Sequence, residues 1–181
     1  MESYGHKRGK AVAAVEAVEF EDVYKAYFGP VYRYLLRLSG DEQLAEELAA
    51  ETFFRALRAA EGFRGECEVR VWLCQIAKNA YYTHQKKSRR ARPADEALLG
   101  QLADPAPPPE EAAAARDQAA RLRAIADGLP EPYREVFRLR AFGELPYKDI
   151  ASLYEKTANW ACVTYHRARE MIRRRWEEEE G

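Results

Sequence analysis

The distribution of proline is the feature that most restricts what this chain can fold into. Residues 93–109 end in a closely spaced group, Pro105, Pro107, Pro108 and Pro109. Proline has no backbone N–H to donate and disfavours the helical conformation in the residue before it, so a regular helix cannot pass through this segment. The segment therefore predicts a linker between two folded units. The predicted divisions are an N-terminal extension of unassigned role (1–18), a first domain (19–92), a linker (93–117), a second domain (118–176) and an acidic tail (177–181).

Amphipathic helical patterns fill the rest of the chain. Ala, Leu, Glu and Arg dominate, apolar side chains recur every three to four residues, and we find no convincing alternation of apolar and polar residues between hairpin turns. The predicted fold is therefore all-α, with two small helical domains joined by a proline-rich, acidic linker. The helices expected in the first domain are 20–38, interrupted near 29–30, then 42–60 and 69–85. Those expected in the second domain are 112–126, 131–141, 147–154 and 159–176.

Helical wheels assign an inner and an outer face to the helices of the first domain. The triplet 39–41, Ser-Gly-Asp, is expected to end one helix and cap the next. The core positions expected are Leu44, Leu48, Phe53 and Leu57 on helix 42–60, and Val69, Trp72, Ile76 and Ala80 on helix 69–85. The residues expected to point away from this core are Gln75, Lys78, Tyr82 and Arg89. A basic and aromatic outer face is therefore expected on helix 69–85.

The last two expected helices have the layout of a helix-turn-helix: a short helix, a tight turn and a longer helix. In this motif the N-terminal half of the second helix presents hydrogen-bond donors to the major groove, and arginines near its rim contact phosphates. The inner face expected for helix 159–176 is Ala161, Tyr165, Ala168 and Ile172. The DNA-contacting residues expected on this helix, called the duplex set below, are Asn159, Trp160, Cys162, Val163, His166, Arg167, Arg169 and Arg173.

Charge is distributed unevenly, although the formal net charge is only -1. Residues 78–92 carry six Lys and Arg and no acid, and residues 167–175 carry five Arg against one acid. A single cluster of this kind is most simply a solvated helix face, but two clusters in separate segments favour two surfaces for nucleic acid.

The sequence also argues against several classes of protein. It has no apolar run long enough to span a bilayer and no apolar signal segment near its start, so we expect a cytoplasmic protein without membrane insertion. Its three cysteines lack Cys-x-x-Cys spacing and are expected to be free thiols. The histidines lie far apart, and neither a phosphate-binding glycine loop nor a zinc-type Cys/His spacing occurs, so we expect no enzyme, no metal and no cofactor.

Three stretches of the sequence resemble extracytoplasmic-function sigma factors of the sigma-70 family. They are residues 41–57, 63–90 and 129–169, and the resemblance spans most of residues 20–176. Its most specific parts are the strings Trp72-Leu73-x-x-Ile76-Ala77-x-Asn79 and Tyr165-His166-Arg167-Ala168-Arg169, in this order on either side of the linker. The chain departs from many relatives at Glu155, where a glycine is common in the turn, and at Trp160 and Cys162, where small or basic residues are common.

The resemblance implies a transcription initiation factor with several partners. These are core RNA polymerase, through its beta-prime clamp and beta flap, promoter DNA and an anti-sigma factor. The first domain would read the minus-ten-type element and the second domain the minus-thirty-five-type element. The residues expected to contact polymerase, called the polymerase set, are Glu47, Glu51, Phe54, Arg55 and Arg58. Those expected to hold the opened DNA strand, called the strand set, are Phe63, Arg64, Lys78, Asn79, Tyr82 and Lys86.

Two other classes of function compete with this interpretation. A stand-alone helix-turn-helix regulator of transcription explains the second domain but leaves the basic aromatic helix of the first without a role. An enzyme acting on nucleic acid would use both basic clusters, but the sequence offers no carboxylate or metal constellation for its chemistry.

Overall fold

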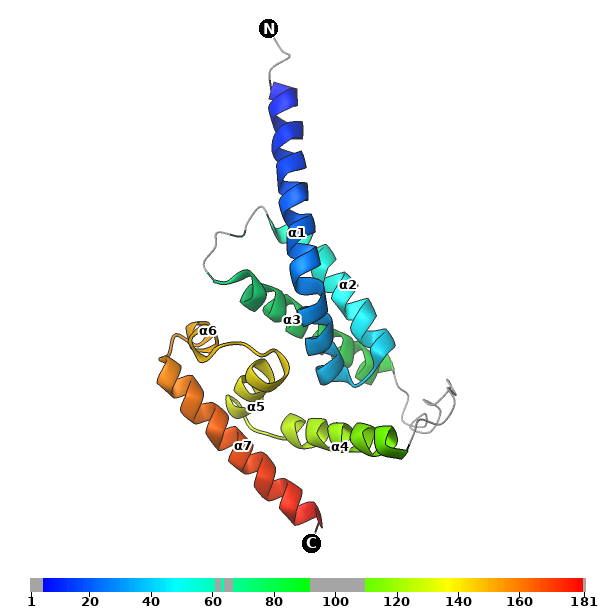
Figure 1. Cartoon of the computed structure of the whole chain (residues 1–181), viewed down its shortest axis with the longest axis vertical. Coiled ribbons are helices and arrows are strands. Elements are labelled where there is room, and N and C mark those ends of the chain that lie inside the picture. The colour runs from blue at the N-terminus through cyan, green and yellow to red at the C-terminus, as the bar shows by residue number, and fades with distance from the viewer. Residues whose placement is uncertain (1–4, 61–62, 64–66, 92–109, 181) are drawn as a thin grey trace.

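The computed structural model describes residues 5–60, 63, 67–91 and 110–180, and the regular elements of this part of the chain are helices (Figure 1). The all-α prediction is therefore confirmed. The N-terminal unit consists of α1 (Gly5–Ser39), α2 (Glu42–Ala59) and α3 (Val69–Ala91). The C-terminal unit consists of α4 (Glu110–Asp127), α5 (Tyr133–Phe137), the π-helical turn η2 (Arg138–Phe142), α6 (Tyr147–Leu153) and α7 (Ala158–Glu180).

The corner between α1 and α2 forms as its sequence predicts. Gly40 adopts a positive φ of 72°, a conformation that glycine reaches without steric cost. The next residue, Asp41, caps α2, because its carboxylate accepts a hydrogen bond from the backbone N–H of Leu44 at 2.9 Å. The chain therefore turns sharply after α1, and α2 packs back against α1.

The interruption expected near residues 29–30 is wrong, since α1 runs without a break from Gly5 to Ser39 with Pro30 inside it. A proline within a helix costs about 3 kcal/mol through a lost hydrogen bond and a steric clash. Packing on both sides of Pro30 offsets this cost. Before it, the ring of Phe28 lies 5.9 Å from that of Phe53 on α2, and after it Val31 and Leu35 are fully buried.

The inner face of α2 is made mostly of small side chains. Leu48 and Phe53 are buried as expected and Leu44 is half-buried at the margin of the core. The fully buried positions are three alanines and a threonine: Ala45, Ala49, Thr52 and Ala56. The prediction that Leu57 lies in the core is wrong, because 49% of this residue is exposed. Residue 57 follows 56 by 100° around the helix, so a face centred on Ala56 turns Leu57 toward the solvent.

The inner face of α3 also differs from the expected one. Of the four expected core residues only Ala80 is fully buried, whereas Val69, Trp72 and Ile76 are half-buried at the margin of the core. The side chains that α3 buries are Val71, Leu73, Cys74, Ala77, Ala80 and Tyr81. These residues cover more of the helix circumference than one amphipathic stripe, because α3 packs against α1 and α2 on one side and faces the C-terminal unit on the other. The helix also continues beyond its expected end at residue 85.

The C-terminal unit contains the predicted helix-turn-helix in α6 and α7. The turn between them holds Glu155 at a positive φ of 53°, the place where a glycine would be free of strain. Of the expected inner face of α7, Ala161, Ala168 and Ile172 are buried, and Tyr165 is half-buried with its ring 6.0 Å from that of Phe137. α4 begins at Glu110, inside the segment assigned to the linker, and α7 includes residues 177–180 of the segment assigned to the acidic tail.

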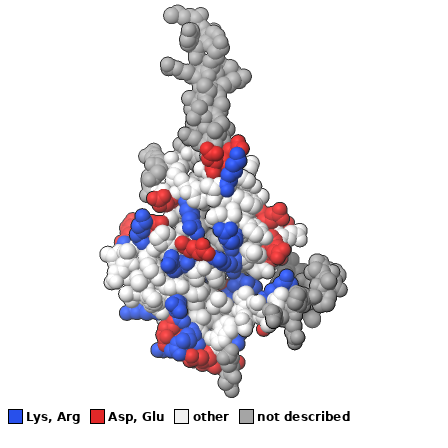
Figure 2. Space-filling view, viewed as in Figure 1, with Lys and Arg blue, Asp and Glu red and all other residues white. Residues whose placement is uncertain are grey.

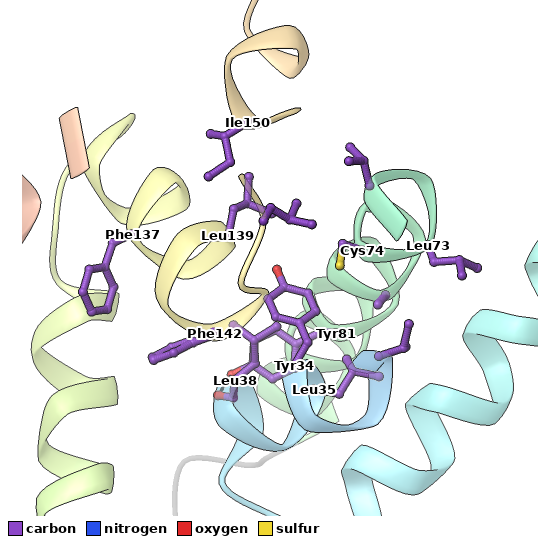
Figure 3. Packing of buried hydrophobic residues seen from close by; sticks show 14 of the residues in the cluster. Tyr34, Leu35, Leu38, Leu73, Cys74, Tyr81, Phe137, Leu139, Phe142 and Ile150 are labelled. Atoms are coloured by element: carbon purple, nitrogen blue, oxygen red, sulfur yellow. Dashed lines mark hydrogen bonds between the residues drawn. The ribbon is translucent and has the colours of Figure 1, made fainter. Parts of the chain in front are cut away.

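The two units share one apolar core, with α5 and η2 lying between α3 and α7 (Figure 1). In Figure 3 the side chains of Tyr34 from α1, Tyr81 from α3 and Phe142 from η2 meet in a common interior. Leu139 of η2, fully buried, lies in the same cluster. The interior is therefore continuous from one unit to the other.

Candidate nucleic-acid and polymerase interfaces

The outer face of α7 presents most of the duplex set to solvent. Asn159, Val163, His166 and Arg167 are exposed near the start of the helix, and Arg169 and Arg173 are exposed further along it. Trp160 and Cys162 are half-buried, with the Trp160 ring 5.1 Å from that of Tyr154 on α6. The same helix buries Ala161 and Ala168 on the opposite side, so the packing of α7 fixes which side chains face outward.

The arginines of the duplex set differ in what surrounds them. Arg173 forms surface ion pairs with Glu170 at 2.6 Å and with Glu177 at 2.7 Å. The Arg169 guanidinium lies 5.9 Å from the centre of the Tyr165 ring. Arg167, nearer the N-terminus of α7, is exposed among Val163 and His166. This position suits a contact with a base edge, whereas the positions further along suit contacts with phosphates.

Two members of the strand set, Lys78 and Tyr82, are partly covered by the C-terminal unit, so the prediction that they lie on an open outer face of α3 is wrong. Lys78 is only 20% exposed and its Nζ lies 3.1 Å from a carboxylate oxygen of Glu135 in the C-terminal unit. Tyr82 is half-buried, and its hydroxyl donates to the other oxygen of Glu135 at 3.3 Å. Asn79 and Lys86 remain exposed.

Burial of Tyr82 has an electrostatic consequence. Loss of solvent, together with the negative charge of Glu135, raises the pKa of the Tyr82 phenol to about 12. The hydroxyl therefore keeps its proton at neutral pH, so it can donate to Glu135 while accepting a hydrogen bond from Arg138.

Glu135 and Arg138 are functional candidates that the sequence analysis missed. Both are buried, and Arg138 also pairs with Asp127 at the end of α4. The sequence gives little signal for them, because four of the seven residues 134–140 are charged and only the tertiary packing shows that Glu135 and Arg138 are the buried ones.

Phe63, another member of the strand set, lies in the segment that precedes α3. The ring of Phe63 stacks on that of Trp72, with the centroids 4.5 Å apart and the planes 25° apart. A surface cavity of about 490 Å³ opens beside them, lined by Phe63, Cys67, Val69 and residues of α6. Arg64 lies outside the described residues. Phe63 therefore borders a space between the two units.

The polymerase set forms one exposed strip on α2. Glu47, Glu51, Phe54 and Arg58 are exposed and Arg55 is half-buried, with 60% of Phe54 accessible to solvent. Arg55 pairs with Glu51 at 2.5 Å, and the Arg58 guanidinium lies 5.8 Å from the centre of the Phe54 ring. Leu57, whose exposure the sequence did not predict, enlarges the apolar part of this strip. An exposed aromatic ring among charges is typical of an anchor in a protein interface.

Charge is mixed over the visible surface. On the face shown in Figure 2, Lys and Arg lie among Asp and Glu instead of forming one large basic field. Within the described ranges, no group of three or more His, Cys, Asp or Glu side chains is arranged to hold a metal ion. Of the helices in that part of the chain, none combines the length and apolar character needed to cross a membrane.

Comparison with known proteins matches both parts of the chain to families of bacterial sigma factor domains. Residues 23–91 match the family Sigma-70 region 2, and residues 119–172 match the family Sigma-70, region 4. The chain is 31% identical over 147 residues to the RNA polymerase sigma-H factor of Pseudomonas aeruginosa, covering 76% of each chain. It is 29% identical over 158 residues to the ECF RNA polymerase sigma factor SigM of Bacillus subtilis, covering 84% of this chain and 92% of that relative.

The fold has counterparts among solved structures. The sigma factor RpoE of Bartonella quintana, crystallised with the anti-sigma factor NepR, matches with a TM-score of 0.59 and 20% identity over 86% of this chain and 95% of that one. At this identity the match shows the fold alone.

The chain therefore belongs to the sigma-70 family of RNA polymerase sigma factors, the transcription initiation factors that direct RNA polymerase to promoters. Within that family, its similarity to SigM and other relatives assigns it to the extracytoplasmic-function group. The match of the first half to Sigma-70 region 2 removes the alternative of a helix-turn-helix regulator that works without polymerase.

Proposed function

We propose that the two domains recognise two promoter elements at different steps of initiation. The second domain (118–176) reads the minus-thirty-five-type element as intact duplex, and the first domain (19–92) holds the minus-ten-type element once its strands separate. The observation that carries this proposal is the outer face of α7, which exposes Asn159, His166 and Arg167 at the start of the second helix of a helix-turn-helix.

The chemistry of the duplex set supports the first step. Asparagine and arginine make paired hydrogen bonds with adenine and guanine in the major groove, and each good pair is worth about 1–3 kcal/mol of discrimination. Arg169 and Arg173 lie further along α7, where side chains reach the phosphates. The exposed Val163 adds an apolar contact of the kind that recognises a thymine methyl group.

The chemistry of the strand set supports the second step. A base that leaves the helical stack needs another surface to cover its faces, and stacking on an aromatic ring is worth about 1–3 kcal/mol per base. Phe63 and Tyr82 are the aromatic rings in the strand set that could stack on a base. Lys78 and Lys86 supply positive charge for the backbone of the separated strand. Asn79, exposed between them, has the donor and acceptor needed to read a base edge.

The remaining partners follow from the exposed strip on α2 and from the relatives. The polymerase set binds the beta-prime clamp, with Phe54 as its apolar anchor, and the second domain binds the beta flap. An anti-sigma factor restrains the chain, as the solved complex of RpoE with NepR suggests. The protein works in the cytoplasm, without catalysis or a cofactor of its own.

Footprinting of unpaired thymines with permanganate tests the division between the two DNA sites. With reconstituted holoenzyme, Arg167→Ala should weaken binding to closed promoter duplex, whereas Asn79→Ala with Tyr82→Ala should leave that binding nearly intact and slow strand opening. A template with a pre-opened upstream bubble should largely rescue the second variant if its defect lies in starting strand opening, and only partly if its defect lies in holding the flipped base. Equal loss of closed binding in both variants would contradict the proposal.

A titration with core polymerase tests the strip on α2. Glu51→Ala with Phe54→Ala should lower the affinity for core enzyme while leaving the helical circular dichroism unchanged. Glu46→Ala, an exposed glutamate of the same helix outside the polymerase set, is the matched control. Unchanged affinity of the folded double variant would remove the role assigned to this strip.

A further inference from the structure

The first turns of α7 carry two apolar side chains on the side that is open to solvent. Val163 is 39% exposed, although its neighbours in the duplex set are polar and basic. Trp160 precedes it by three residues and is half-buried. Side chains three residues apart are neighbours on a helix surface, with their Cβ atoms about 5–6 Å apart. Trp160 and Val163, called the apolar pair below, therefore form one small apolar surface near the N-terminus of α7.

Two contacts fix the position of Trp160. Its backbone N–H donates to the hydroxyl oxygen of Thr157 at 3.2 Å, which caps the first turn of α7. Its ring lies 5.1 Å from the ring of Tyr154, the residue that follows α6, with 47° between the two planes. Both aromatic residues pack against the apolar core. A side chain that is already held in place loses little further freedom on binding, so its contact with a base costs little entropy.

The chemistry of the apolar pair limits what it can recognise in the major groove. The side chain of Val163 has no hydrogen-bonding group, and Trp160 has only its indole N–H. Thymine is the base whose major-groove edge carries a methyl group, whereas the other bases present donors and acceptors there. A valine against a polar edge would leave that edge without a partner, which costs free energy. The apolar pair therefore favours the methyl group of thymine.

The spacing of the pair along α7 sets how many bases it contacts. In zinc-finger helices, which also enter the major groove by their N-terminal part, residues three positions apart contact successive bases. Trp160 and Val163 have this spacing. Arg167 continues the same side of the helix, since it follows Val163 by four residues and is also exposed. The apolar pair thus spans two successive base pairs, and Arg167 reaches the next position.

We propose that Trp160 and Val163 are specificity-determining residues of the second domain, and that they select two successive thymines in the minus-thirty-five-type element by their methyl groups. This inference rests on the function proposed for the duplex set. Each methyl group that the pair removes from water should strengthen promoter binding about fourfold, the effect of burying one CH₂-sized group. Trp160 stands where small or basic residues are common in relatives, so this preference should be particular to this chain.

Selection from a random pool identifies the element, and removal of single methyl groups tests how it is read. Holoenzyme made with the full chain is incubated with duplexes randomised over the upstream element, and the bound duplexes are sequenced. We expect two successive thymines to be enriched. Each of them is then replaced by deoxyuridine, which differs from thymidine only by the missing methyl group. Each replacement should weaken binding about fourfold.

Variants of the pair assign each methyl group to its side chain. Val163→Thr keeps the β-branched shape but replaces a methyl group by a hydroxyl, so it should abolish the effect of deoxyuridine at one position and leave the effect at the other. Trp160→Arg, a change to a residue type common in relatives, should do the converse. Val163→Ile keeps the apolar surface and is the matched control, with normal sensitivity at both positions. The comparison of thymine with deoxyuridine is made within each variant, so a change of overall charge or affinity cancels.

Three results would overturn the inference. Selection could enrich an upstream element without successive thymines. Deoxyuridine could leave the affinity unchanged at both positions, which would mean that the methyl groups are not read. Val163→Thr could keep full sensitivity at both positions, which would mean that another residue reads them. In all three cases Arg167→Ala would still weaken promoter binding, whereas failure of the proposed function would show as no enriched upstream element and no effect of Arg167→Ala.

Discussion

The two basic helices, α3 and α7, look alike in sequence and have different surroundings in the structure. α7 buries one stripe of small and apolar residues and turns a polar, arginine-rich face to solvent. α3 is buried on two sides, and the middle of its polar face, at Lys78 and Tyr82, meets Glu135 of the other unit. A basic helix with an aromatic face can therefore be covered by its own chain, provided that acidic and polar partners satisfy it.

The largest expected contrast between the helices concerns their cysteines. Cys74 on the inner side of α3 is 2% exposed, and burial raises the pKa of its thiol to about 12. Cys162 is half-buried at the edge of the outer face of α7. Because Cys74 can react only when the fold opens, at a cost of about 5 kcal/mol or more, we expect a maleimide to modify Cys162 at least about a thousandfold faster.

Mass spectrometry of a Cys67→Ser variant after timed labelling gives both rates. The adduct on Cys162 should also block binding to promoter duplex in holoenzyme, since it projects toward the groove. Rapid modification of Cys74 would refute the two-sided burial of α3. Promoter binding that survives full modification of Cys162 would refute the orientation of α7.

Shortening one apolar side chain on each helix tests the same difference in burial through its effect on stability. Leu73→Ala removes a fully buried side chain of α3 and should lower the free energy of unfolding by about 2–5 kcal/mol. Val163→Ala removes a side chain that is 39% exposed on α7 and should change stability by no more than about 0.5 kcal/mol. Urea denaturation followed by circular dichroism measures both values. Similar costs at the two positions would mean that the outer face of α7 is packed.

Replacing one basic side chain on α7 and one on α3 distinguishes a contact that reads a base from one that neutralises a phosphate. Arg167→Ala should cost about 1–3 kcal/mol in promoter affinity and relax the preference at one base position, if it makes a paired contact with guanine. Lys86→Ala should weaken single-strand binding about equally for all sequences and reduce the salt dependence by about one counterion. Holoenzyme binding to a panel of single-base promoter variants at several salt concentrations measures both effects. If both variants lost affinity with the same dependence on DNA sequence, the proposed difference between Arg167 as a base contact and Lys86 as a phosphate contact would be wrong.

The smallest expected effect concerns two tyrosine hydroxyls. Tyr82→Phe on α3 removes the acceptor that Arg138 uses, so it should lower stability by about 1 kcal/mol. Tyr165→Phe on α7 is the control, since among the described hydrogen bonds none is assigned to the Tyr165 hydroxyl, and it should be near neutral. The midpoint temperatures of thermal unfolding of the two variants and the unaltered protein, measured at one protein concentration, compare these effects. A neutral Tyr82→Phe would show that this hydroxyl adds nothing to the docking of the units.

Sequence patterns predicted the local elements well where one strong rule applied. Gly40 and Asp41 fixed the corner between α1 and α2, and the spacing of Ala161, Ala168 and Ile172 identified the inner face of α7. The predictions that failed were those in which packing outweighed a local rule. Pro30 remained inside α1 because apolar contacts on both sides offset its cost, and Leu57 was exposed because alanines on α2 allow a closer approach than leucine does.

The sequence by itself determined that the chain is helical, that its second part is a helix-turn-helix and that it carries two basic helices. Only the tertiary structure decided which of these helices is open. Helical periodicity assumes that a helix buries one face, so it places the inner face of α7 well but misplaces that of α3, which buries side chains on two sides. Lys78 looks like an exposed cation in every local window, because its partner Glu135 lies far along the chain and reaches it only when the two units dock.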